Sequence, residues 1–115
     1  MTEENDRELL EFAAKAAGYK IAQYLGNGCA YVYNNASNHK PKTTFEWMPW
    51  HDDGDALRLA VKLELLIHVE TCYYVHVMKD QIHVTEHIAK DGSGCLFAAT
   101  RLAILRAAAE IGKAK

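Results

Sequence analysis

Residues 67–78 read IHVETCYYVHVM, and their side chains alternate between two sets. An alternation with a period of two is typical of a β-strand, whose successive side chains point to opposite faces. A turn at residues 79–80 would lead into a return strand over residues 81–88. One face is expected to carry Ile67, Val69, Thr71, Tyr73, Val75 and Val77, and the other His68, Glu70, Cys72, Tyr74, His76 and Met78. The pattern predicts a β-hairpin in the C-terminal half of the chain.

A second hairpin is predicted nearer the N-terminus. Residues 19–25 and 29–34 are rich in Tyr, Ile, Leu and Val, which favour strands. The intervening residues 26–28 read GNG, and Asn-Gly pairs accept the positive φ angles of tight hairpin turns. The polar stretch over residues 34–44 contains a proline and is expected to form a surface loop.

Three helices complete the expected set of elements. They are predicted over residues 5–17, from residue 52 or 53 to about residue 66, and over residues 95–111. Asn5 and Asp52 are candidate N-caps, and Asp55 stands three residues after Asp52 as in a capping box. Gly18 and Gly112 are candidate helix stops. The second helix is apolar on more than one side, which predicts deep burial or packing against a second subunit.

These elements predict a single α+β domain over residues 1–115, with the order α-β-β-α-β-β-α. We expect an α/β/α sandwich in which three helices flank one four-stranded mixed or antiparallel sheet. The length fits one domain, and half of the residues are apolar while 24% are charged. This composition excludes a disordered, collagen-like or coiled-coil chain.

Charge and cysteine content narrow the function classes. The net charge of −2 argues against a nucleic-acid binder, because phosphate binding needs a basic surplus. No apolar stretch approaches the roughly 20 residues of a membrane span, and the N-terminus lacks a signal-peptide pattern. The three cysteines form no CxxC pair, which argues against a disulfide scaffold or a zinc knuckle. We therefore expect a cytoplasmic protein with reduced thiols.

Two stretches of the chain resemble the phage ABA sandwich domain family of small bacteriophage and prophage proteins. They are PWHDDGDALRLAVKL at residues 49–63 and ATRLAILRAAAEIG at residues 99–112, and LLEFAAKAAGYKI at residues 9–21 is similar more loosely. The resemblance implies an α/β/α sandwich encoded by a phage or prophage and acting in the bacterial host cell. It implies no established catalytic activity, so no site residue is carried over from the family.

The acidic loop over residues 52–55 is the first candidate site. Asp52, Asp53 and Asp55 place three carboxylates within four residues, and carboxylate oxygens are the ligands that Mg²⁺ prefers. The alternative interpretation is structural, because acids at the start of a helix cap it and interact favourably with its dipole.

The histidines of the C-terminal hairpin are the second candidate. With a turn at residues 79–80, His76 would lie opposite His83, and Cys72 opposite His87. Either pair could supply two ligands to Zn²⁺ or Ni²⁺. The alternative is a polar strand face with partly exposed imidazoles.

The function we expect is that of a non-catalytic module that binds a host or phage protein. Trp47, Trp50, Tyr31 and Tyr33 are the candidate contact residues, because Trp and Tyr dominate protein interfaces; core packing is the alternative for each. A homodimer would use Leu59, Leu63 and Leu66 as its seam.

Two alternative functions stay open. One is a small metal-dependent hydrolase or nuclease that uses the acidic loop and the histidine-rich hairpin, with Zn²⁺ or Mg²⁺ as its cofactor. The other is a structural or assembly component of the virion. The binding module itself requires no cofactor.

Overall fold

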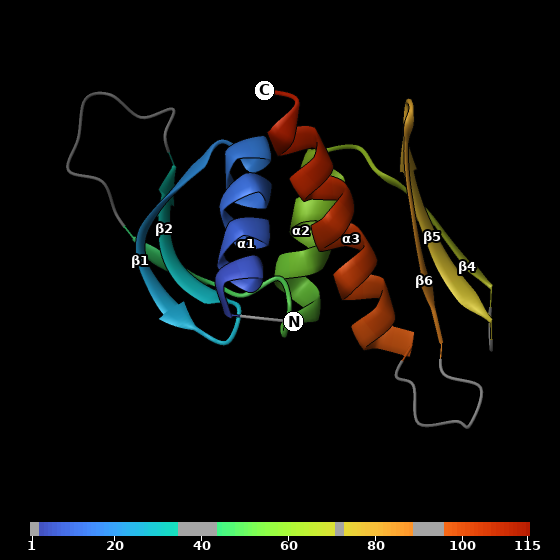
Figure 1. The fold of residues 1–115 in the computed structure, drawn as a ribbon, viewed down its shortest axis with the longest axis horizontal. Coiled ribbons are helices and arrows are strands. Elements are labelled where there is room, and N and C mark those ends of the chain that lie inside the picture. Colours follow the sequence, from blue (N-terminus) through green and yellow to red (C-terminus); the bar gives the residue numbers. More distant parts are fainter. Residues whose placement is uncertain (1–2, 35–43, 71–72, 89–95) are drawn as a thin grey trace.

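Two three-stranded antiparallel sheets enclose a layer of three helices in the structure, which is a computed structural model (Figure 1). It describes residues 3–34, 44–70, 73–88 and 96–115. In chain order the elements are α1 (Glu3–Ala17), β1 (Tyr19–Gly26), β2 (Cys29–Asn34), β3 (Phe45–Trp47), α2 (Asp53–Lys62), β4 (Leu66–Glu70), β5 (Tyr74–Lys79), β6 (Ile82–His87) and α3 (Leu96–Lys113). The first sheet has the order β1-β2-β3 and the second the order β4-β5-β6.

The α+β class is confirmed, but the prediction of one four-stranded sheet flanked by helices is wrong. The expected long strand over residues 67–78 is divided into β4 and β5, which pair with each other, and β3 adds a third strand to the first sheet. Each sheet is thus a separate, open three-stranded unit with two edge strands. The helices, which are apolar on more than one side, lie between the two sheets (Figure 1).

The N-terminal hairpin is confirmed with its turn. Asn27 and Gly28 have φ angles of +54° and +76°, which suit a two-residue hairpin connection. Ala30 and Val32 of β2 are buried against the helices. Ala30 also pairs with Trp47 of β3, a strand too short to be visible in the sequence pattern.

Helix α2 ends at Lys62, four residues earlier than expected. Glu64 adopts a left-handed conformation with φ of +56°. The amide of Leu65 donates to the carbonyl of Ala60 at 3.0 Å, and the amide of Glu64 donates to the carbonyl of Val61 at 3.1 Å. These two bonds form a Schellman motif, which usually has glycine at the left-handed position. Because a glutamate and not a glycine occupies this position, the sequence does not indicate where the helix ends.

Helices α1 and α3 pack closely in the middle layer. A Cβ atom at Gly112 would lie 1.8 Å from the carbonyl oxygen of Phe12, so only glycine permits this approach. Gly112 therefore lies inside α3, which continues to Lys113, and the prediction that it stops the helix is wrong. Gly18, with φ of +81°, does follow the end of α1 as expected. Helix α1 begins at Glu3, two residues before the predicted cap.

Within the parts of the chain that the structure describes, none of the helices has both the length and the hydropathy needed to cross a bilayer.

Candidate functional site

An apolar groove of about 390 Å³ lies between α2, β4 and the first turns of α3; we call it the β4 groove. Leu57, Val69 and Phe97 line it and expose 58%, 41% and 66% of their surface. Its remaining lining residues are Asp53, Ala56, Ile67, Leu96, Thr100, Arg101 and Ile104. Exposed apolar side chains that border a groove mark a binding surface more often than scattered ones do.

An ion pair holds one end of the β4 groove. The guanidinium of Arg101 contacts the carboxylate of Asp53 at 2.5 Å, and its Nε donates to the backbone carbonyl of Trp50 at 2.8 Å. Arg101 extends from α3, and Asp53 begins α2. These contacts fix the two helices relative to each other, so the β4 groove is formed before any partner binds.

Strand β4 borders this groove and is an edge of its sheet. It pairs with β5 on one side, and no strand pairs with its other side within the described ranges. Ile67 and Val69 face the helices together with buried Val75 and Val77 of β5, their register partners. The backbone N–H and C=O groups along the edge of β4 that points away from β5 can therefore pair with an added strand.

The other three sheet edges carry features that discourage strand addition. Strand β1 has two register shifts along its pairing with β2, and β3 is only three residues long. On the inner face of β6, Glu86 forms an ion pair with Arg106 of α3. Irregular, very short and inwardly charged edges are the devices that natural sheets use against edge pairing. Strand β4 has none of them.

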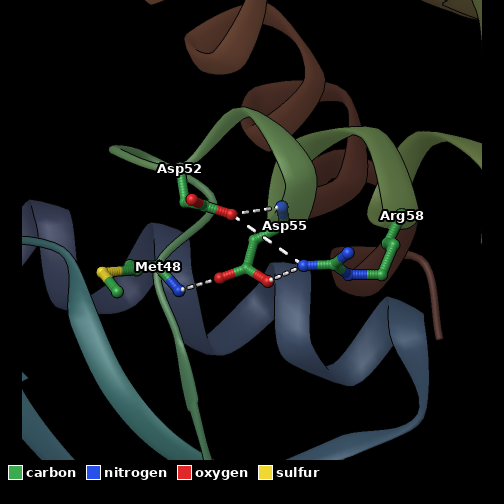
Figure 2. A network of polar contacts seen from close by, with 4 residues as sticks. All are labelled: Met48, Asp52, Asp55 and Arg58. Carbon is green, nitrogen blue, oxygen red and sulfur yellow. Dashed lines mark hydrogen bonds and ion pairs between the residues drawn. The ribbon is translucent and has the colours of Figure 1, made fainter.

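The acidic loop is a helix cap (Figure 2). Asp52 accepts a hydrogen bond from the amide of Asp55 at 2.8 Å, which confirms its role as N-cap of α2. Asp55 accepts from the amide of Met48 at 3.0 Å and from Arg58 at 2.9 Å. Contact with Asp55 raises the pKa of the Arg58 guanidinium above its ordinary value. Each carboxylate of the loop, including that of Asp53, thus has a structural partner.

The histidines gather on the outer face of the β4-β5-β6 sheet. The strands turn at residues 80–81, so Lys79 pairs with Ile82 and the predicted turn at residues 79–80 is wrong. His76 lies opposite Thr85 rather than His83, and the register differs by two residues from the expected one. A shift by an even number keeps every side chain on its face. His76 and His83 still meet diagonally, with Nε2 and Nδ1 3.3 Å apart.

The second predicted pair of metal ligands, Cys72 with His87, stays a prediction. His87 lies opposite Tyr74, with ring centroids 6.4 Å apart, and Cys72 lies outside the described residues. Across the described ranges, no group of three or more His, Cys, Asp or Glu side chains could hold a metal ion.

The two tryptophans that were expected to contact a partner instead join β3 and the following turn to the rest of the fold. Trp47 is 3% exposed and packs edge-on against Tyr19. Trp50 is partly buried, and its ring lies 2.9 Å from the position of a Cβ atom at Gly28. Core packing, the alternative for these residues, is what the geometry supports.

The two tyrosines lie apart from the β4 groove. Tyr31 and Tyr33 alternate along β2 with buried Ala30 and Val32, so they occupy the outer face of the first sheet. Both are partly exposed. Their role in binding stays a prediction.

The seam predicted for a homodimer is divided between core and surface. Leu59 and Leu63 are buried within the chain itself, while Leu66 is 62% exposed. Leu59 and Leu63 thus belong to the core side of α2, while Leu57 and Val61 on its other side stay exposed. Dimerisation itself stays a prediction.

The residues that form the β4 groove were not predicted as a group from the sequence. Leu57 was not singled out within the second predicted helix, nor was Phe97 within the last one. The available signal was Leu57 with Val61 at helical spacing, a second apolar stripe beside the one that contains Leu59.

Cys29 is the one cysteine within the described residues, and its thiol is free and partly buried. Burial, and then the nearby charge of Glu46, raise the pKa of this thiol above its ordinary value. A raised pKa lowers the thiolate fraction, which is the opposite of what a nucleophile requires.

Comparisons with known proteins gave no match to a family model, to a curated protein or to a solved structure. The resemblance to the phage ABA sandwich domain family stays a prediction.

Proposed function

We propose that the chain is a non-catalytic module that binds an extended segment of a host or phage protein along strand β4. The observation that carries the proposal is the juxtaposition of an unprotected edge strand with an apolar groove. The phage context rests on the sequence resemblance alone, and it would place the interaction in the cytoplasm of the bacterial host.

Strand addition uses both features at once. Backbone hydrogen bonds to an edge strand provide affinity for any extended segment, and pockets for alternate side chains provide selectivity. The inner face of an added strand would continue the row formed by Ile67 and Val69. Its apolar side chains would then enter the β4 groove between Leu57 and Phe97.

A segment of a different protein suits this edge better than a second copy of the chain. In the antiparallel register that overlaps all five residues of β4, Leu66 would face Glu70 of the second copy, and His68 would face its own counterpart. These outer-face pairs set an apolar side chain against an acid and two imidazoles against each other. Cross-strand pairs of opposite charge or of two apolar residues are the favourable ones.

The expected segment has a recognisable chemistry. It alternates apolar residues, which face the β4 groove, with polar residues on the outer face. His68 Nε2 and Glu70 Oε2 lie 3.2 Å apart on the outer face of β4, so polar side chains of the segment that hydrogen-bond to this pair would complement the strand.

The experiment is a selection of random displayed peptides on the immobilised full chain, followed by affinity measurements on an enriched peptide. Val69→Lys places a charge on the inner face of β4 and should weaken binding by about tenfold or more. Leu25→Lys is the matched control, because Leu25 is exposed to a similar extent, 43% against 41%, but lies on β1. This control should leave the affinity unchanged.

Three outcomes would overturn the proposal. They are the absence of any enriched peptide, equal binding to both lysine variants, and a wild-type dimer that Val69→Lys converts to a monomer. The last outcome, measured by analytical ultracentrifugation, would assign the edge to a second copy of the chain.

A further inference from the structure

The histidine pair on the outer face of the second sheet has the geometry of a chelating site. His76 Nε2 and His83 Nδ1 lie 3.3 Å apart, and the ring planes are inclined at 57°. Two ligand nitrogens of one tetrahedral Zn²⁺ lie about 3.3 Å apart when each Zn–N bond is about 2.05 Å.

Thr85 orients the imidazole ring of His76 for metal binding. Its Oγ1 lies 2.7 Å from His76 Nδ1, on the neighbouring strand and in direct register with His76. In the tautomer whose Nδ1–H donates to this hydroxyl, the lone pair of Nε2 points toward His83. Such a bond to the second ring nitrogen fixes the tautomer and orientation of metal-binding histidines in general.

We propose that His76 Nε2 and His83 Nδ1 form a two-ligand site for a divalent transition ion that prefers imidazole, with Zn²⁺ as the reference ion. Water completes the coordination sphere on this partly exposed face. Zn²⁺, Cu²⁺ and Ni²⁺ share the preference for imidazole nitrogen.

Metal binding requires no additional base to accept a proton from either imidazole ring. In the metal-free pair, His83 Nδ1–H donates to His76 Nε2. When the ion binds, the proton of His83 moves to its own Nε2 through solvent, and both rings stay neutral. The ion takes the place of the shared proton between the two nitrogens.

This site is independent of the proposed function. His76 and His83 lie on the outer face of the sheet, whereas Ile67 and Val69 face the β4 groove on the inner side. Val69→Lys, which acts on the inner face, should weaken peptide binding and leave metal binding unchanged, and His83→Ala on β6 should weaken metal binding and leave peptide binding unchanged.

The test is a titration of the full chain with ZnCl₂ by isothermal calorimetry at neutral pH. Histidine-detected ¹⁵N NMR distinguishes imidazole binding from binding to the three thiols. We expect the Nε2 resonance of His76 and the Nδ1 resonance of His83 to shift together at one equivalent of Zn²⁺. His76→Ala and His83→Ala should each weaken this binding by about tenfold or more, because a single imidazole does not chelate.

Two further variants separate this site from general surface binding. His87→Ala removes an exposed imidazole from the same face and strand as His83, and it should leave the affinity unchanged. Thr85→Val should weaken binding by about tenfold, as removal of outer-shell partners does at other sites. Equal affinity in the His76→Ala, His83→Ala and His87→Ala variants would overturn the proposal, as would Zn²⁺ shifts confined to other residues.

Discussion

The two sheets have the same strand arrangement, but their edge strands differ. Each has three antiparallel strands in sequential order, each follows a helix, and each covers one side of the same helical layer (Figure 1). The first sheet has an irregular edge at β1 and a three-residue edge at β3. The second has a charged inner face at β6 and a regular, apolar edge at β4. The two sheets thus differ in edge chemistry rather than in strand content, and the regular edge at β4 is where we propose that a partner binds.

The first prediction concerns the close packing of α1 against α3 in the helical layer that both sheets cover. Gly112→Ala would place a Cβ atom 1.8 Å from the carbonyl oxygen of Phe12, and backbone must move to relieve the clash. We expect a loss of about 3 kcal/mol in the free energy of unfolding, the upper end of overpacking costs. Urea unfolding measures it.

Gly54→Ala is the control for this prediction. Gly54 lies in the first turn of α2, where the nearest atoms are side-chain atoms of Arg58 and Asp52 at 3.2 Å. We expect a change within about 1 kcal/mol, since alanine also favours the helix. Equal losses in the two variants would contradict the close packing of α1 against α3.

The second prediction compares neighbouring positions on β4 and β5. Val69 and Val75 are register partners, but Val75 is fully buried whereas Val69 is 41% exposed. Val75→Ala should cost about 2 kcal/mol in unfolding free energy, and Val69→Ala less than about 1 kcal/mol. Urea unfolding of both variants provides the measurement. A larger loss of unfolding free energy for Val69→Ala than for Val75→Ala would show that another part of the protein covers the β4 edge.

The third and smallest effect concerns β6, the edge strand that carries the charged Glu86 on its inner face. Arg106→Leu removes the partner of Glu86, whose side chain is 16% exposed, while that of Arg106 is 41% exposed. Because solvent screens this pair, we expect a cost of about 1 kcal/mol in unfolding free energy.

The double variant Arg106→Leu with Glu86→Leu sharpens the comparison of the two edges. It removes the inward charge that protects β6, so self-association should appear in ultracentrifugation while the fold is retained. If the double variant sediments as the wild type does, the charge on β6 is not what keeps this edge closed.

The sequence predicted those parts of the fold that local chemistry determines. The Asn27-Gly28 turn and the Asp52 cap were expected, since each depends on residues within a few positions. The end of α2 was missed because Glu64, not glycine, adopts the left-handed conformation. The arrangement of the sheets was missed because β3 is three residues long and because the chain turns between β4 and β5.

The candidate sites were predictable to different extents. The predicted pairing of His76 opposite His83 was wrong by two residues in register, but the two side chains still meet diagonally, because a shift by an even number of residues keeps them on the same face. The β4 groove was not predicted, since it joins Leu57, Val69 and Phe97 from three separate elements, and the apolar stripe of α2 indicates only the first of them. Only the packing of those elements places the side chains together.

Amide hydrogen exchange, measured by NMR on the full chain with and without a selected peptide, tests the central claim most directly. We predict that peptide binding slows exchange at alternate amides of residues 66–70, as β4 becomes an inner strand, and leaves β1, β3 and β6 unchanged. New protection on the first sheet around Tyr31 and Tyr33, without any at β4, would contradict the account.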